Sequence, residues 1–235
     1  MLKIKIGLII LTQILATSVG AAIPNQIGKA YDILQLPSEN QKSVIAKSPD
    51  HLYRDFVQLA FDDKISMKLR WKALMAAAQI RKEKSTVDLL KASSDSQWFM
   101  RSAALAALAE YNPSESEKVA KKLLKDKALV VRSSAVDILS QSSSPEVRDL
   151  FWEELHQKYN FKNKQSLWIR PQMLTALALK PKDQESTLFS QLLKEPEIQM
   201  QLIAVRGLEK LTGMKLGDAR TSPVKMVQLW QNYYK

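Results

Sequence analysis

The sequence repeats itself along most of its length. When it is aligned against itself, five segments superimpose at spacings of 31, 31, 38 and 31 residues, on Arg70, Arg101, Arg132, Arg170 and Gln201. A period of this length is typical of a solenoid, in which each repeat is one supersecondary unit that buries its apolar face only against its neighbours. We therefore expect an array of stacked units.

The pattern inside each repeat indicates a pair of helices. Relative to the five aligned residues, the positions three and one before and three, four and seven after are apolar in every copy. These positions fall within an arc of roughly 160° on a helix, so we expect all of them to be buried. A second amphipathic stretch precedes each of these helices, at residues 51–61, 86–92, 115–124, 146–159 and 185–193.

The remaining segments of this part of the chain are expected to close the array at its ends. Residues 23–48 carry apolar positions without the repeat signature, and residues 213–235 place a tryptophan-bearing amphipathic stretch after a glycine-containing turn. Only six glycines occur in 235 residues, which favours helices. The expected fold is all-α: an α-solenoid of about five helix pairs over residues 49–212, with N- and C-terminal capping segments.

An arginine stands in the middle of the apolar face in four of the five copies. A buried guanidinium must be paired, because the desolvation of an unpaired charge is costly. In two repeats an aspartate lies six residues before the arginine, Asp95 before Arg101 and Asp126 before Arg132. Each aspartate falls at the turn between the paired helices, where it could meet an arginine of its own repeat or of a neighbouring one.

This arrangement resembles the HEAT repeat, in the short form common in bacterial proteins. Residues 95–108 and 126–139 carry its pattern: aspartate, arginine six positions later, alanine three further on and leucine seven further on. The resemblance implies that Asp95, Arg101, Asp126 and Arg132 form a hydrogen-bonded structural ladder inside the stack. The other copies depart from the pattern, since Lys64 and Lys164 occupy the aspartate position and Glu195 precedes Gln201.

The N-terminus reads as a targeting segment. Residues 1–22 combine a basic start, an apolar stretch from Ile6 to about Leu15 and small residues from Ser18 to Ala22. This order is typical of a cleaved secretory signal peptide, and the apolar stretch is about half the length that a membrane span needs. We expect cleavage near Ala21/Ala22, a periplasmic or secreted protein, and membrane contact only through the signal peptide during export.

The composition leaves little for catalytic or metal chemistry. The chain has no cysteine and two histidines, which excludes a thiol nucleophile and thiolate metal sites. Glu153 and His156 form only half of a di-metal motif, and no glycine-rich phosphate loop or nucleophile elbow occurs. We therefore expect no catalytic residue, no cofactor and no metal.

The longest repeat, between Arg132 and Arg170, is the candidate for partner recognition. Its seven extra residues lie in a region rich in aromatic and basic residues, and insertions in solenoids often lie on a binding face. One interpretation places Phe151, Tyr159 and Trp168 in the core. The other predicts a partner-binding patch with a basic rim, since aromatic residues are enriched at interfaces: Trp152, Phe161, Lys158, Lys162 and Lys164.

The function expected from these features is a non-enzymatic protein-interaction scaffold of the cell envelope that binds an extended partner. The formal net charge of +11 would suit nucleic acid, but export separates the protein from it, so an anionic envelope surface or an acidic protein is the better electrostatic partner. Two alternatives remain: an enzyme or a lyase-like accessory factor built on the same scaffold, and a binder of anionic envelope polymer.

Overall fold

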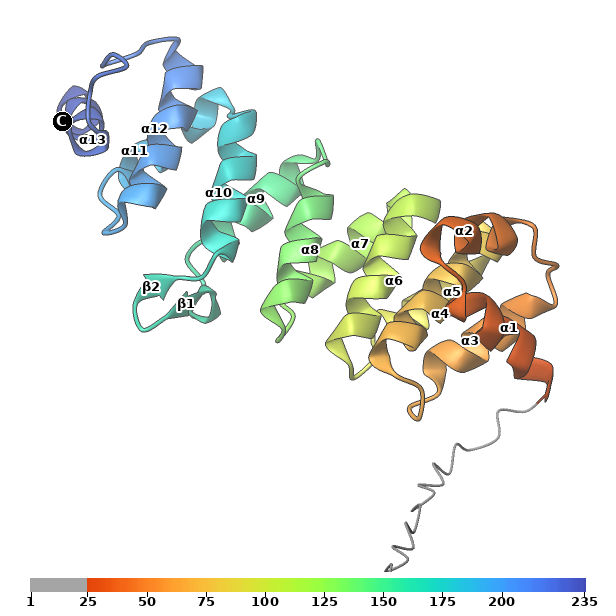
Figure 1. The fold of residues 1–235 in the computed structure, drawn as a ribbon. Helices are drawn as coiled ribbons and strands as arrows, with labels where there is room; N and C mark the ends of the chain where they lie inside the picture. Colours follow the sequence, from red (N-terminus) through yellow and green to blue (C-terminus); the bar gives the residue numbers. More distant parts are fainter. Residues whose placement is uncertain (1–24) are drawn as a thin grey trace, which may run out of the picture.

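The structure is a computed structural model that describes residues 25–235. The expected signal peptide and the first two residues of the expected N-terminal capping segment lie outside the described residues. The described chain forms a single row of stacked helices (Figure 1).

Five helix pairs make up the array, and the expected all-α solenoid is confirmed. In each pair a first helix leads through a turn into a second helix, and the second helices pack side by side along the row. The pairs are α3 (Leu52–Phe61) with α4 (Met67–Arg81), α5 (Thr86–Ala92) with α6 (Trp98–Tyr111), α7 (Pro113–Leu123) with α8 (Leu129–Leu139), α9 (Pro145–Glu154) with α10 (Ile169–Leu179), and α11 (Ser186–Leu192) with α12 (Ile198–Thr212).

Additional helices cover both ends of the row. At the start, α1 (Asn25–Gln35) packs against α3 and α2 (Ser38–Ala46) packs against α4, so the two helices stack as a further pair that lacks the repeat signature. At the end, α13 (Pro223–Tyr233) packs against α12 and buries Trp230 completely. The Gln231 side chain donates to the carbonyl oxygen of Leu193 at 2.8 Å and fixes α13 on the last pair.

The core follows the repeat positions with one exception. The apolar positions one before and three, four and seven after the aligned residue are buried in every copy, apart from the half-buried Leu69. The position three before is not: Met67, Trp98 and Ile198 are 52%, 42% and 41% exposed, against the expectation from the helical arc. Each is the first residue of its helix, at the rim of the stack where the neighbouring helices end, so nothing covers its outer side.

The seven extra residues of the fourth pair form a short β-hairpin. After a 3-10 turn (Lys158–Asn160), β1 (Phe161–Lys162) pairs antiparallel with β2 (Gln165–Ser166). The two residues between the strands, Asn163 and Lys164, have φ values of 51° and 65°, as a type I′ turn requires. Residues 161–166 contain no glycine. The Asn-Gly or Asp-Gly pair that usually predicts such a turn is therefore missing, and the hairpin could not be predicted from the sequence.

A backbone position that favours glycine is occupied by a lysine at the end of α4. Lys82 has φ 48° and ψ −124°, a region that side chains with a Cβ rarely adopt. We expect Lys82→Gly to raise the free energy of unfolding by about 1 kcal/mol, measured by urea denaturation. Lys84→Gly is the matched control and should lower it, because Lys84 has no such strain to relieve; equal effects of the two substitutions would contradict this account.

Candidate functional site: an arginine ladder and a groove on the second helices

The four repeat arginines are all buried in the stack. Arg101 is 5% exposed and forms a bidentate ion pair with Asp126: Nε donates to Oδ2 at 2.6 Å and Nη2 to Oδ1 at 2.7 Å. Its Nη1 donates to the carbonyl oxygens of Asp95 and Ser96, at 2.8 and 2.9 Å. The guanidinium therefore ties its own turn to the turn of the next repeat.

Two more ion pairs join a buried arginine to the acid of the following repeat. Arg70 lies 3.5 Å from Asp95, and Arg170 lies 2.9 Å from Glu195, in each case the acid of the following repeat. The ladder thus runs between neighbouring repeats, and the aspartate's backbone carbonyl, rather than its side chain, serves the arginine of its own repeat. Glu195 takes the place of the aspartate, which the departure from the repeat pattern concealed.

The ladder is interrupted at Arg132, where the hairpin is inserted. Arg132 donates to the carbonyl oxygens of Asp126 at 2.7 Å and Tyr159 at 3.3 Å, and its guanidinium lies over the Tyr159 ring, 5.6 Å from the centroid. Its Nε is buried and has no hydrogen-bond partner among the described residues. Desolvation lowers the pKa of Arg132, as expected for a buried cation without a carboxylate on its guanidinium.

The ion pair with Arg101 also lowers the pKa of Asp126. Burial alone raises the pKa of Asp126, but the hydrogen bonds from Arg101 and from the Ala128 backbone N–H outweigh it, so the pKa lies below its ordinary value. Asp126 therefore stays ionised in the folded protein. The role that this geometry supports for the ladder is structural, since both partners are nearly inaccessible.

Trp152, one of the predicted partner-binding residues, is held by its own chain. Its indole Nε1 donates to Glu185 Oε1 at 2.9 Å, and its ring packs edge-on against Phe189 with centroids 5.0 Å apart. Glu185 also accepts two bonds from Arg148, at 2.8 and 2.5 Å. Trp152 is therefore a half-buried link between the fourth and fifth pairs and not a free recognition residue.

The other predicted patch residues divide between core and surface. Phe161 is half-buried, with the Arg170 guanidinium 4.1 Å from its ring centroid, while Lys158, Lys162 and Lys164 are exposed. The aromatic pair and the lysines thus do not form one exposed patch. The alternative interpretation is corrected as well: Phe151 is buried, but Tyr159 and Trp168 are 41% and 57% exposed, because the hairpin displaces them to the rim.

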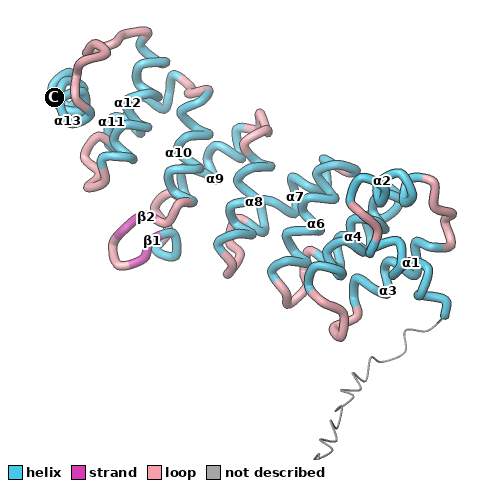
Figure 2. The backbone as a smooth tube through the Cα atoms, in the orientation of Figure 1, coloured by secondary structure: helices cyan, strands magenta, loops and turns pink. Residues whose placement is uncertain are grey.

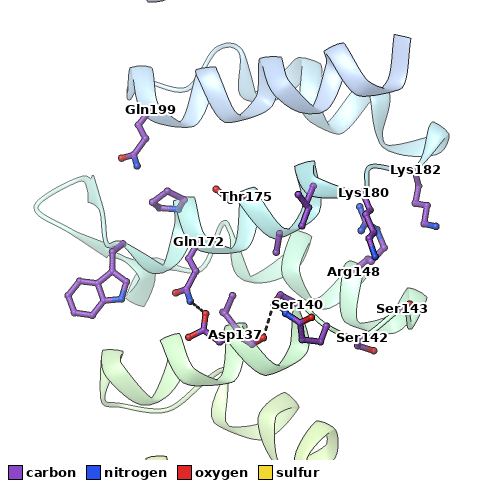
Figure 3. Close-up of a pocket in the computed structure, with 16 residues that line it drawn as sticks. Asp137, Ser140, Ser142, Ser143, Arg148, Gln172, Thr175, Lys180, Lys182 and Gln199 are labelled. Atoms are coloured by element: carbon purple, nitrogen blue, oxygen red, sulfur yellow. Dashed lines mark hydrogen bonds between the residues drawn. The ribbon is translucent and has the colours of Figure 1, made fainter. Parts of the chain in front are cut away.

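A groove of about 590 Å³ lies along the second helices. It runs across α8 and α10 to Gln199 of α12 (Figure 3), and the loop after α8 and Arg148 of α9 also line it. On its floor the Gln172 amide donates to Asp137 Oδ1 at 2.7 Å and accepts from the Ser133 hydroxyl at 2.8 Å. These bonds join α8 to α10 and hold the floor rigid.

The ends of the groove differ in chemistry. Trp168 directly precedes α10, and Leu179 and Lys180 stand at the other end of this helix, with Lys182 beyond them. Trp168 and Leu179 are 57% and 62% exposed. Thr175 between them is exposed and has no side-chain hydrogen bond among the described residues. The groove thus offers apolar contacts at both ends with free polar groups between them.

Sequence reasoning missed this groove for a physical reason. Most of its lining residues are polar, and glutamine, threonine and lysine are typical of a face in contact with water. The one aromatic residue of the groove, Trp168, directly precedes α10, and one interpretation of the sequence placed it in the core.

The described residues hold no arrangement that suggests a metal site or a membrane span. No group of three or more histidine, aspartate or glutamate side chains within residues 25–235 could hold a metal ion. None of the helices in this range is long and apolar enough to cross a bilayer.

Comparison with known proteins agrees with the geometry. Residues 86–167, from α5 through the hairpin, match the model of the family described as HEAT repeats. This segment is thus similar to HEAT repeats, and the described helices form a HEAT-like solenoid. HEAT repeats generally form helical scaffolds for protein interaction and are generally non-enzymatic.

No curated protein matches the sequence. A solved structure described as the crystal structure of an engineered protein aligns with 80% of this chain and 97% of its own length, at 18% identity and a TM-score of 0.43.

Proposed function

We propose that the protein is a non-enzymatic interaction scaffold of the cell envelope that binds an extended segment of a partner protein in the groove across α8, α10 and α12. The observation that carries this proposal is the groove itself, with an exposed tryptophan at one end and unpaired polar groups along it. The cell-envelope location rests on the signal peptide expected from residues 1–22.

The chemistry of the groove suits a peptide in an extended conformation. Such a peptide presents free backbone N–H and C=O groups, which the Thr175 hydroxyl and the Gln199 amide can bond. Trp168 and Leu179 offer apolar contact for side chains at either end, and aromatic anchors contribute much of the energy of protein interfaces. Lys180 and Lys182 favour acidic side chains at the Leu179 end.

The enzymatic alternative gains no support from the described residues. An active site would be favoured by buried acids without structural partners. Both buried glutamates have structural partners, and Glu185 pairs with Arg148. Glu154 Oε2 accepts from the Tyr159 hydroxyl, and its Oε1, which has no hydrogen-bond partner among the described residues, lies 3.4 Å from the Lys125 ammonium. Burial and the bond to Glu154 raise the pKa of Tyr159, which keeps the phenol neutral.

Filling the groove tests the proposal. We expect Thr175→Arg to reduce partner capture at least about tenfold, because a long side chain in the middle of the groove excludes a bound chain. The measurement is affinity capture of envelope proteins with the tagged protein, followed by titration of the captured partner. Urea denaturation should show unchanged stability, since Thr175 is exposed.

Thr187→Arg is the matched control, because Thr187 is exposed on α11, away from the groove, and the substitution adds the same side chain and charge. It should leave capture unchanged. Equal capture by both variants would refute the groove as the binding surface, and equal loss in both would mean that added charge rather than groove occupancy disturbs binding.

A further inference from the structure

A row of exposed apolar side chains runs along one rim of the array. The turns inside the helix pairs all lie on the same side of the row, as Figure 2 shows. We call the stretches 62–68, 93–98, 124–130, 156–168 and 193–199 the intra-pair rim. Every repeat places one large apolar residue there, at or next to the first position of its second helix, each at least 41% exposed: Met67, Trp98, Val130, Trp168 and Ile198.

The same rim is strongly basic. Eight exposed lysines lie on it, and Asp63 is its one exposed carboxylate. The other acids of the rim already have partners. Asp95, Asp126 and Glu195 pair with the buried arginines. Asp62 accepts from the Lys64 backbone N–H at 2.9 Å, and Glu197 from the Ser166 backbone N–H at 2.6 Å. The exposed lysines are Lys64, Lys68, Lys125, Lys127, Lys158, Lys162, Lys164 and Lys194.

The opposite rim lacks both properties. We call the stretches between successive helix pairs, residues 47–51, 82–85, 112–115, 140–146 and 180–185, the inter-pair rim. Its five exposed lysines face four exposed carboxylates, and these stretches form no row of exposed large apolar residues: only Leu179, before the last stretch, and Val87, two residues after the second, border them. The exposed carboxylates of the inter-pair rim are Asp50, Glu83, Glu146 and Asp183. The asymmetry argues against a uniformly solvated surface.

We propose that the intra-pair rim docks the protein on the surface of an anionic lipid bilayer. Helices in such a stack pack about 8–10 Å apart, so the five apolar side chains extend over roughly 40 Å as a line of separate contacts. A protein partner is usually held by a central cluster of anchors in a pocket, whereas a lipid surface accepts single side chains spread along an edge.

Both kinds of rim residue suit a lipid surface. Tryptophan and tyrosine prefer the boundary between headgroups and acyl chains, and lysines near the surface are attracted to anionic headgroups. An anionic polymer would engage the lysines but has no use for the apolar row. This proposal revises the expectation that the membrane is contacted only through the signal peptide. It shares Trp168 with the groove but does not require that the groove binds a partner.

Tryptophan quenching by brominated lipid locates the contact. The full-length protein is mixed with phosphatidylglycerol vesicles that carry bromine on their acyl chains, and with brominated phosphatidylcholine vesicles as the neutral comparison. We expect quenching on the anionic vesicles and little on the neutral ones. The apolar stretch of residues 6–15 would itself bind vesicles in an unprocessed chain, but it contains no tryptophan, so the signal reports the folded array.

Two double substitutions assign the quenching to the rim. Trp98→Phe with Trp168→Phe should remove most of it. Trp71→Phe with Trp152→Phe should leave it nearly unchanged, because these two tryptophans are half-buried and lie off the rim. Quenching that persists in the first variant, or that is absent from the parent protein, overturns the proposal.

Matched lysine substitutions test the charge contribution. In vesicle co-sedimentation, Lys158→Gln, Lys162→Gln and Lys164→Gln together should weaken binding to phosphatidylglycerol at least about tenfold. The control combines Lys84→Gln, Lys180→Gln and Lys182→Gln on the inter-pair rim, which removes the same charge and should change binding less than about twofold. Equal losses in the two triple variants would mean that net charge alone acts, and would overturn the rim as a docking edge.

Discussion

Replacing Arg101 with methionine is expected to lower the free energy of unfolding by about 3 kcal/mol, while the same change at Arg132 should cost less than about 1 kcal/mol. Both arginines are 5% exposed and occupy the same repeat position. They differ in their partners: the Arg101 guanidinium neutralises the buried Asp126, whereas no carboxylate pairs with Arg132 among the described residues. Methionine preserves most of the apolar stem, so the comparison isolates the charge.

The physical reason for the difference is the charge left behind. Without Arg101, the Asp126 carboxylate stays buried and keeps only the bond from the Ala128 backbone N–H, at 2.7 Å. Without Arg132, two backbone carbonyls lose a donor, but a desolvated cation with an unpartnered Nε is removed at the same time. Urea denaturation followed by circular dichroism measures both effects.

The stability difference between the parent protein and Arg101→Met, measured at acid pH, is the control for this prediction. The pKa of Asp126 is lower in the folded protein than in the unfolded chain, so the pair contributes fully above the ordinary aspartate pKa of about 4. That contribution is lost as the pH falls through the lowered value. The difference between the parent protein and Arg101→Met should therefore shrink below about pH 4. Similar losses at neutral pH for both methionine variants would show that burial, and not pairing, decides the cost.

Much of the architecture followed from the sequence because the repeat supplied the same information five times. The period indicated the stacked helix pairs, and the phase of the apolar positions placed Arg101 and Arg132 in the core. The choice between ladder partners did not follow, since Asp126 lies six residues before Arg132 and 25 after Arg101, and only the stacking geometry shows that its carboxylate faces Arg101. Sequence spacing says nothing about which neighbour is nearer in space.

The surfaces were harder to foresee than the core. The positions of the apolar residues on the second helix predicted that Trp98 is buried. Helical periodicity contains no information about where the neighbouring helices end, and Trp98 lies beyond those ends. Trp152 read as a recognition residue because its partner, Glu185, lies 33 residues away in the next pair. The groove could not be predicted because Gln172 and Thr175 resemble the residues of any helix face in contact with water. They line a groove only because α8 and α12 lie on either side of α10.

The network around Glu185 provides the second large effect. Glu185→Ala is expected to lower the free energy of unfolding by about 3 kcal/mol, because the 4% exposed carboxylate accepts from Arg148, Trp152 and the Lys182 backbone N–H. Its removal leaves the largely buried Arg148 guanidinium with only the Leu177 carbonyl oxygen, at 3.2 Å, and the Trp152 indole N–H without its acceptor. Glu153→Ala, at a mostly exposed glutamate of α9, is the matched control and should change stability by less than about 0.5 kcal/mol.

The pH dependence of the same network follows from its ionisation. Burial alone raises the pKa of Glu185, but the hydrogen bonds from Arg148, Trp152 and Lys182 outweigh it and hold the pKa below its ordinary value. Its contribution is therefore complete above about pH 4.5 and disappears as the pH falls through the lowered pKa. Glu185→Ala should thus lose stability less steeply than the parent between about pH 4.5 and 3.

Because Arg148 and Trp152 belong to α9 while Glu185 precedes α11, this network couples the fourth pair to the fifth on the first-helix side of the row. The Arg170–Glu195 ion pair couples the same two pairs at the intra-pair rim. Loss of Glu185 should therefore speed amide hydrogen exchange in α11 to α13 more than in α3 to α6, since each repeat contacts only its neighbours. Uniform acceleration along the array would instead mean that the solenoid unfolds as one cooperative unit.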